Sequence, residues 1–169
     1  MTTTSYSVHP TPIGRALVVV SDEGLVALHI LDGPHDDELA DLSAALHAVP
    51  DHDADATAQV TTQLDEYFAG RRRRFDVPLD WRLVDGFTRE ALAAVCEIPY
   101  AQTASYGEVA ITAQRPRAHR AVGSACARTP ISIIVPAHRV VRSDGSIGEY
   151  GGRPEIKRFL LDLEAATGE

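Results

Sequence analysis

The sequence has few cysteines and lacks the long apolar runs and leader patterns of membrane and secreted proteins. Its 169 residues include two cysteines, one methionine and one tryptophan. No run approaches the roughly eighteen consecutive apolar residues of a membrane span. The first residues also lack the basic-then-apolar pattern of a signal peptide. We therefore expect a soluble, cytoplasmic protein that does not associate with a membrane.

The two cysteines, Cys96 and Cys126, are too few and too far apart for a disulfide framework. They also match no metal-ligand spacing, and no Cys/His ligand set occurs elsewhere, so we expect neither a bound metal nor a cofactor. Cys96 lies in the apolar run ALAAVCEI, where we expect a small buried side chain. Both thiols are expected to be reduced.

The hydrophobic fraction of 44% is enough for a buried core in one large or two small domains. The net charge of −8 argues against a nucleic-acid partner until its distribution is counted. Residues 1–83 carry six Arg and fourteen acidic residues, whereas residues 84–169 carry ten basic and ten acidic residues. Residues 109–143 hold six Arg and no acidic residue. That segment favours phosphate binding, although a solvated basic loop fits equally well.

The first half alternates apolar and polar residues in a pattern typical of β-strands. Residues 5–9, 16–21 and 25–31 predict a hairpin or meander, and two helices should follow near 36–49 and 57–69. The run of four arginines after the second helix, Arg71 to Arg74, is expected to form a surface turn rather than a DNA contact. We place a domain boundary near residues 81–85.

The second half has helical periodicity interrupted by Pro- and Gly-bearing turns, which predicts a helix-turn-helix with its recognition helix at residues 118–128. The small residues of that helix permit close approach to a groove or tight packing against another helix. Pro154 should begin a final helix that packs inward through an apolar face. That face comprises Ile156, Phe159, Leu160 and Leu163.

Several motifs in both halves carry a resemblance to a known family. The second half contains IPYAQTASYGEVA, RAVGSACARTPISIIVPAHRVVRSDGSIGEYGG and KRFLLDLE, and the first half contains TPIG and EYFAGRRRRFDVPLD. Together these resemble the alkylguanine-DNA alkyltransferase family. The resemblance implies an α+β protein with an N-terminal ribonuclease-H-like domain at residues 1–83. A helical, winged-helix-like DNA-binding domain is implied at residues 84–169.

Members of that family flip an alkylated guanine out of duplex DNA and transfer its alkyl group to a cysteine in a PCHR motif. Here the motif is Pro136-Ala137-His138-Arg139. A methyl side chain has no lone pair with which to attack, so alkyl transfer to Ala137 is excluded. Cys126 lies eleven positions earlier without an adjacent histidine, and we do not expect it to take over.

The resemblance also assigns roles to the remaining site residues. His138 would be the base that activates the acceptor, and Glu164 would orient it. Tyr106 would assist flipping and bind the extruded base, while Arg120 would fill the gap in the stack. Residues expected at the DNA are Tyr106, Arg120, Ala121, Gly123, Arg128 and Arg139. Residues expected to line the base pocket are Val135, Pro136, Tyr150, Gly151 and Gly152.

The sequence departs from the family pattern at two further positions. Thr129 stands where the family usually has an asparagine that acts as a hinge. Glu149 places a negative charge beside Tyr150, where it could weaken phosphate binding. Both departures bear on the efficiency of flipping.

Three functions follow. The first is a monomeric lesion binder, similar to alkyltransferase-like proteins, that holds duplex DNA containing alkylated guanine and recruits nucleotide-excision repair proteins. Such proteins commonly lack the N-terminal domain present here. The second is an alkyltransferase whose acceptor cysteine was deliberately changed to alanine. The third is a helix-turn-helix DNA-binding module without a lesion pocket, which predicts no preference for alkylated guanine.

Overall fold

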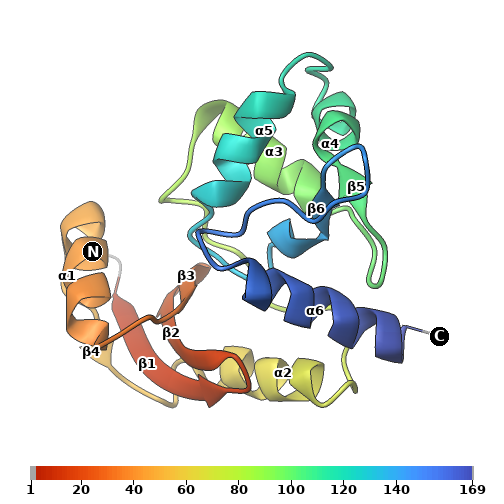
Figure 1. Ribbon diagram of the computed structural model, residues 1–169. Helices are drawn as coiled ribbons and strands as arrows, with labels where there is room; N and C mark the ends of the chain where they lie inside the picture. Colours follow the sequence, from red (N-terminus) through yellow and green to blue (C-terminus); the bar gives the residue numbers. More distant parts are fainter. Residues whose placement is uncertain (1–2, 169) are drawn as a thin grey trace. The chain divides into compact units, whose positions relative to one another are not determined.

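The computed structural model describes residues 3–168 and divides the chain into two compact units, Met1–Leu83 and Val84–Glu169. The expected α+β class is confirmed, because the first unit contains a β-sheet and the second is mainly helical (Figure 1). None of the described helices is both long and apolar enough to cross a membrane.

The first unit is built around a four-stranded sheet with the strand order β3-β2-β1-β4. Its elements are β1 (Thr4–Thr11), β2 (Gly14–Ser21), β3 (Gly24–Ile30), α1 (His35–Leu46), β4 (Asp51–His52) and α2 (Ala58–Phe68). The first three strands form the antiparallel meander that the sequence predicts, and β4 runs parallel to β1.

The core of this unit lies against the central strand β2. Four consecutive residues of that strand, 16–19, have no exposed surface, so both faces of the strand are covered. Leu42 of α1 packs with Leu17 and Val19 of β2 and with Val26 of β3 in one hydrophobic cluster. This contact fixes α1 on the sheet.

The second unit consists of helices joined by tight turns, with one small sheet. Its elements are α3 (Gly86–Val95), β5 (Ala104–Ser105), α4 (Tyr106–Thr112), α5 (His119–Ala127), the 3-10 turn η1 (Ala137–Arg139), β6 (Val140–Val141) and α6 (Pro154–Thr167). The strands β5 and β6 pair in parallel. Helices α4 and α5 occupy the positions of the expected helix-turn-helix.

A capping box fixes the start of α4. The Ser105 hydroxyl accepts a hydrogen bond from the Glu108 amide at 3.0 Å, and the Glu108 carboxylate accepts one from the Ser105 amide at 3.3 Å. Both of these amides are left without helical partners by the geometry of a helix start. The box therefore fixes the helix start, and with it the backbone position of Tyr106, the first residue of α4.

The apolar segment before η1 is buried without forming regular secondary structure. Ile131, Ile133 and Val135 are each at most 1% exposed. Ile133 has a positive φ of 70°, a conformation that is strained for a β-branched residue. The segment is thus a packed loop rather than a strand.

Two expectations about side-chain burial are wrong. Cys96 is exposed, because α3 ends at Val95 and Cys96 occupies its C-cap. Phe159 of α6 is 40% exposed. The fully buried positions of α6 instead include two charged residues, Lys157 and Glu164.

Candidate functional site

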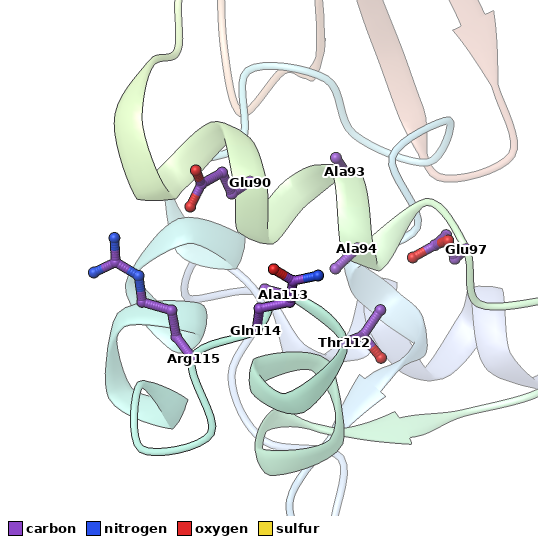
Figure 2. Close-up of a pocket in the computed structure, with 8 residues that line it drawn as sticks. All are labelled: Glu90, Ala93, Ala94, Glu97, Thr112, Ala113, Gln114 and Arg115. Atoms are coloured by element: carbon purple, nitrogen blue, oxygen red, sulfur yellow. The ribbon is translucent and has the colours of Figure 1, made fainter.

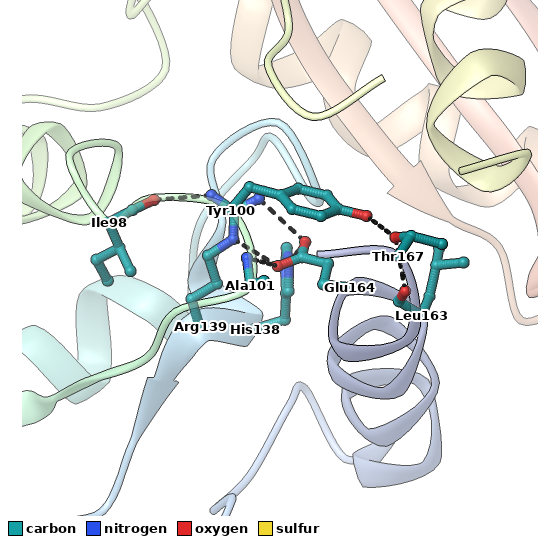
Figure 3. A network of polar contacts seen from close by, with 8 residues as sticks. All are labelled: Ile98, Tyr100, Ala101, His138, Arg139, Leu163, Glu164 and Thr167. Atoms are coloured by element: carbon teal, nitrogen blue, oxygen red, sulfur yellow. Dashed lines mark hydrogen bonds and ion pairs between the residues drawn. The ribbon is translucent and has the colours of Figure 1, made fainter. Parts of the chain in front are cut away.

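A buried ion-pair network joins η1 to α6. The Glu164 carboxylate lies 2.7 Å from the His138 Nε2 atom, and it accepts hydrogen bonds from Arg139 Nε and Nη2 at 2.9 and 3.0 Å (Figure 3). It also accepts a hydrogen bond from the Ala101 amide at 3.2 Å. His138 and Glu164 are at most 1% exposed. The carboxylate is therefore surrounded by donors, as a buried charge requires.

The guanidinium of Arg139 is fully engaged in contacts within this network. Besides its two bonds to Glu164, it donates to the Ile98 carbonyl at 2.8 Å, and its guanidinium lies 5.6 Å from the centre of the Tyr100 ring. The side chain is only 8% exposed. The expectation that Arg139 contacts DNA is therefore corrected, because these contacts would have to break before the side chain could reach a phosphate.

His138 is held in its neutral form. Complete burial lowers its pKa, and this effect outweighs the opposing hydrogen bond with Glu164. The neutral ring donates its single proton from Nε2 to the carboxylate, which leaves Nδ1 as an acceptor. Within the described structure Nδ1 has no hydrogen-bond partner. The network thus presents an unused basic nitrogen in the same turn as Ala137.

Tyr106 is half-buried and lies between Gly123 and Gly148, of which only Gly148 makes a close approach. A Cβ atom added at Gly123 of α5 would lie 3.9 Å from the Tyr106 ring. One added at Gly148 would lie 3.3 Å from the Tyr106 hydroxyl, and Gly148 has a φ of 75°. Helix α5 and the loop after β6 therefore both lie against Tyr106.

The expected pocket residues divide into buried and exposed groups. Burial raises the pKa of Tyr150 to about 12, although its hydroxyl hydrogen-bonds to Ser132 and to the backbone of Ile133. These bonds attach Tyr150 to the segment that leads to Val135 and Pro136, both of which are buried. Gly151 and Gly152 are exposed and have positive φ angles of 56° and 77°. They form the open side of the loop.

Lys157 is a site residue that the sequence analysis missed. It is 1% exposed, and its Nζ donates to the Val140 carbonyl at 2.6 Å and to the Glu149 carbonyl at 3.4 Å. Nζ also lies 5.9 Å from the centre of the Tyr106 ring. Its burial could have been predicted from the sequence, because Lys157 lies one turn before Leu160 on the buried face of α6. A lysine in that position is easily taken for a surface residue.

Helix α5 exposes part of its surface to solvent. Arg120 and Ala121 are exposed on the helix and Arg128 at its C-cap, whereas Val122 and Ala125 are buried against the rest of the unit. After Arg128, the Thr129 hydroxyl accepts from the Ile131 amide and donates to the Ile131 carbonyl. Thr129 therefore closes the turn that connects α5 to the buried loop.

A groove of about 630 Å³ lies elsewhere in the second unit, between α3 and the turn after α4 (Figure 2). Glu90 lines it from α3 and Glu97 from the turn that follows α3, whereas Gln114 and Arg115 line it from the turn after α4. Its two carboxylates disfavour phosphate, and it contains none of the expected pocket residues. Among the described residues, no group of three or more His, Cys, Asp or Glu side chains is arranged to hold a metal ion.

Comparisons with known proteins match both halves of the chain. Residues 4–81 match the ribonuclease-like domain, and residues 86–166 the DNA-binding domain, of 6-O-methylguanine DNA methyltransferase. A methylated-DNA–protein-cysteine methyltransferase from Methanosarcina barkeri is 38% identical over 94% of this chain and 96% of its own length.

Solved structures give the same result. The crystal structure of the Mycobacterium tuberculosis O6-methylguanine methyltransferase is 36% identical, with a TM-score of 0.83, and the match covers 97% of this chain and 94% of that one. The structure of the M. tuberculosis protein in complex with DNA matches with a TM-score of 0.82 and 36% identity, over 96% and 94% of the two chains. This chain therefore belongs to the DNA repair family of the 6-O-methylguanine DNA methyltransferases, which are also called alkylguanine-DNA alkyltransferases.

Proposed function

We propose that this protein binds duplex DNA, extrudes an alkylated guanine into the pocket beside Tyr106 and Tyr150, and holds the base without accepting its alkyl group. The observation that carries the proposal is an intact His138–Glu164 pair next to an alanine. The groups that would activate an acceptor are in place, whereas position 137 offers no nucleophile.

Neither cysteine of the chain is suited to replace an acceptor at 137. Burial raises the pKa of Cys126 to about 11, so this group is a thiol at neutral pH. The thiolate is the nucleophilic form, and only a very small fraction would be present. Cys96 lies at the end of α3, and no histidine adjoins it in the sequence. We therefore propose that the protein binds alkylated guanine without transferring the alkyl group to itself.

The exposed surface of α5 is the proposed DNA-binding face. Arg120 and Arg128 provide positive charge, and the small residues Ala121 and Gly123 allow the backbone to approach a groove. A relative with the same fold and 36% identity has been crystallised with DNA. Contacts to phosphates should supply most of the affinity, so binding should weaken steeply with salt.

Recognition of the lesion should depend on extrusion of the base. Flipping costs a few kcal/mol, and least for a damaged base whose pairing is already weak. In this proposal half-buried Tyr106 contacts the extruded nucleotide, and exposed Arg120 enters the vacated position in the stack. Because flipping of normal guanine costs more, the alkylated base is selected without any chemistry.

A protein that binds a lesion without removing it requires a second activity to complete repair. We propose nucleotide-excision repair proteins as its partners, on the basis of the resemblance to alkyltransferase-like proteins. In this account the bound monomer marks the lesion, and the excision proteins remove the damaged strand.

The proposal is tested by two variants and one mass measurement. Tyr106→Phe and Arg120→Ala should lower affinity for a duplex with one O6-methylguanine by about tenfold, equivalent to ~1.4 kcal/mol. Affinity for the unmodified duplex should change much less. After incubation with methylated duplex, the intact mass of the wild-type protein should not change. Equal losses on both duplexes would indicate a general DNA-binding module, and a mass gain of one methyl group would show transfer.

A further inference from the structure

We propose that Lys157 is a positioning residue that ties the two walls of the lesion pocket together, and that its positive charge makes discrimination between alkylated and normal guanine dependent on pH. This inference rests on the function proposed above, because the walls in question are those of the pocket. Lys157 itself is buried and is not proposed to touch the base.

The contacts of Lys157 span separate parts of the second unit. Its Nζ donates to the Val140 carbonyl in β6 and to the Glu149 carbonyl in the loop that carries Tyr150. The same ammonium lies 5.9 Å from the centre of the Tyr106 ring, within the range of a cation–π interaction. One buried charge on α6 therefore holds the tyrosine on α4 and the loop that bears the second tyrosine.

The arrangement needs the charged form of Lys157. An ammonium donates strongly to two carbonyls and is attracted to an aromatic face, whereas a neutral amine donates weakly and loses the cation–π attraction. Neutral Lys157 would leave the Glu149 carbonyl weakly held. The loop with Tyr150 and the Tyr106 ring would then no longer share a common anchor.

The groups that face Lys157 determine where it titrates. Burial lowers its pKa to about 8, and the positive charge of Arg142 acts in the same direction. Glu149 favours the charged form, whereas Cys126, which also faces Lys157, is an uncharged thiol at this pH. His138 of η1 also faces Lys157, but it is neutral at this pH. Lys157 is therefore charged at pH 7 and loses its proton within a range that duplex DNA tolerates.

Stability and discrimination should respond to this titration in opposite directions. The folded-state pKa lies below the ordinary value of 10.5, so between about pH 8 and pH 10 the unfolded chain binds more protons. For this group, the free energy of unfolding therefore rises with pH over that range. Lesion discrimination should fall over the same range, because the charge is lost. If Lys157 only stabilised the fold, discrimination would not fall while the free energy of unfolding rises.

The experiment measures the ratio of the dissociation constants for unmodified and O6-methylguanine duplexes at pH 6.5, 7.5, 8.5 and 9. The ratio removes general effects of pH on DNA binding. For the wild type, a ratio of about tenfold at pH 6.5, or ~1.4 kcal/mol, should fall several-fold by pH 9. Lys157→Met should give a low ratio at every pH. Lys157→Arg, which keeps its charge throughout, should retain a ratio that does not change with pH.

Arg158→Met is the matched control, since Arg158 is the next residue of α6 and its side chain is 56% exposed. It should leave the wild-type pH profile intact. A wild-type ratio that is high and constant from pH 6.5 to 9, or a Lys157→Met protein with the wild-type ratio, would overturn the inference while leaving the proposed function standing. A wild-type ratio near one at every pH would refute the proposed function itself. If Lys157→Met does not fold, the wild-type profile decides.

Discussion

The Nε2 atom of His138 lies 2.7 Å from Oε2 of Glu164, within a site that water does not reach. This pair connects η1, which contains Ala137, to the last helix. Burial keeps the imidazole neutral against the opposing effect of Glu164, and the bond from Nε2 leaves Nδ1 as an acceptor. In the function proposed here, this pair would activate a nucleophile, and position 137 carries an alanine.

Ala137→Cys should therefore convert the protein into an alkyltransferase. A thiol beside neutral His138 can pass its proton to the imidazole, and the thiolate can attack the methyl carbon of O6-methylguanine. The S–C bond forms as the bond from that carbon to O6 breaks, and the released guanine takes up a proton. Intact-mass spectrometry after incubation with methylated duplex should show one added methyl group, located at position 137 by peptide mapping. Ala137→Ser is the control and should gain nothing, because a hydroxyl is much less acidic than a thiol. An Ala137→Cys protein that still binds the lesion but gains no mass would show that the network cannot activate an acceptor.

Glu164→Gln should destabilise the fold strongly. It removes the charge that Arg139 pairs with inside the protein, and breaking one side of a buried ion pair costs about 3–5 kcal/mol. The control is Glu155→Gln on the same helix, where a 68% exposed carboxylate lies 3.5 Å from Arg153. That change should cost less than about 1 kcal/mol. Urea unfolding measures both free energies of unfolding. If Glu164→Gln lost as little stability as is expected for Glu155→Gln, the buried network would add nothing to stability.

Mild acid should also lower stability. Burial lowers the folded-state pKa of His138 and of His29, so below about pH 6.5 the unfolded chain binds more protons than the folded one. The free energy of unfolding should then fall with decreasing pH, by at most ~1.4 kcal/mol per pH unit for each histidine. His138→Gln should remove its share of the slope between pH 7 and 5.5. A slope that this variant leaves unchanged would show that His138 is not the group responsible.

Arg128→Ala should weaken DNA binding without changing discrimination. Arg128 is exposed at the end of α5, and a contact to phosphate carries no information about the base. Affinity for methylated and unmodified duplexes should fall by the same factor, and the slope of log affinity against log salt should decrease by about one. Arg71→Ala, at an exposed arginine of the first unit, is the comparison and should change neither quantity. A selective loss on the methylated duplex would place Arg128 in the pocket.

The sequence predicted those parts of the molecule that depend on local patterns. The meander over residues 4–30 and the helix over residues 119–127 follow from alternation, periodicity and turn residues. The family resemblance singled out His138 and Glu164, which the structure brings into contact although 26 positions separate them.

Buried charged residues are the part of the site that sequence patterns do not readily reveal. Arg139 was counted with the exposed arginines, and Lys157 was overlooked, because charge usually indicates a surface position. The position of Glu164 indicates that it is buried, because it follows Ile156 and Leu160 at intervals of four on the inward face of α6. A carboxylate on an apolar face needs cationic partners, but only the fold identifies which ones.

The most direct test of the account is the affinity of the unaltered protein for a short duplex with one O6-methylguanine, compared with the same duplex unmodified, at 50 and 200 mM salt. The account predicts a preference of about tenfold or more for the methylated duplex, ~1.4 kcal/mol. Absolute affinity on both duplexes should fall steeply as salt increases. Equal affinities at both salt concentrations would contradict it, because the pocket beside Tyr106 and Tyr150 would then select no lesion.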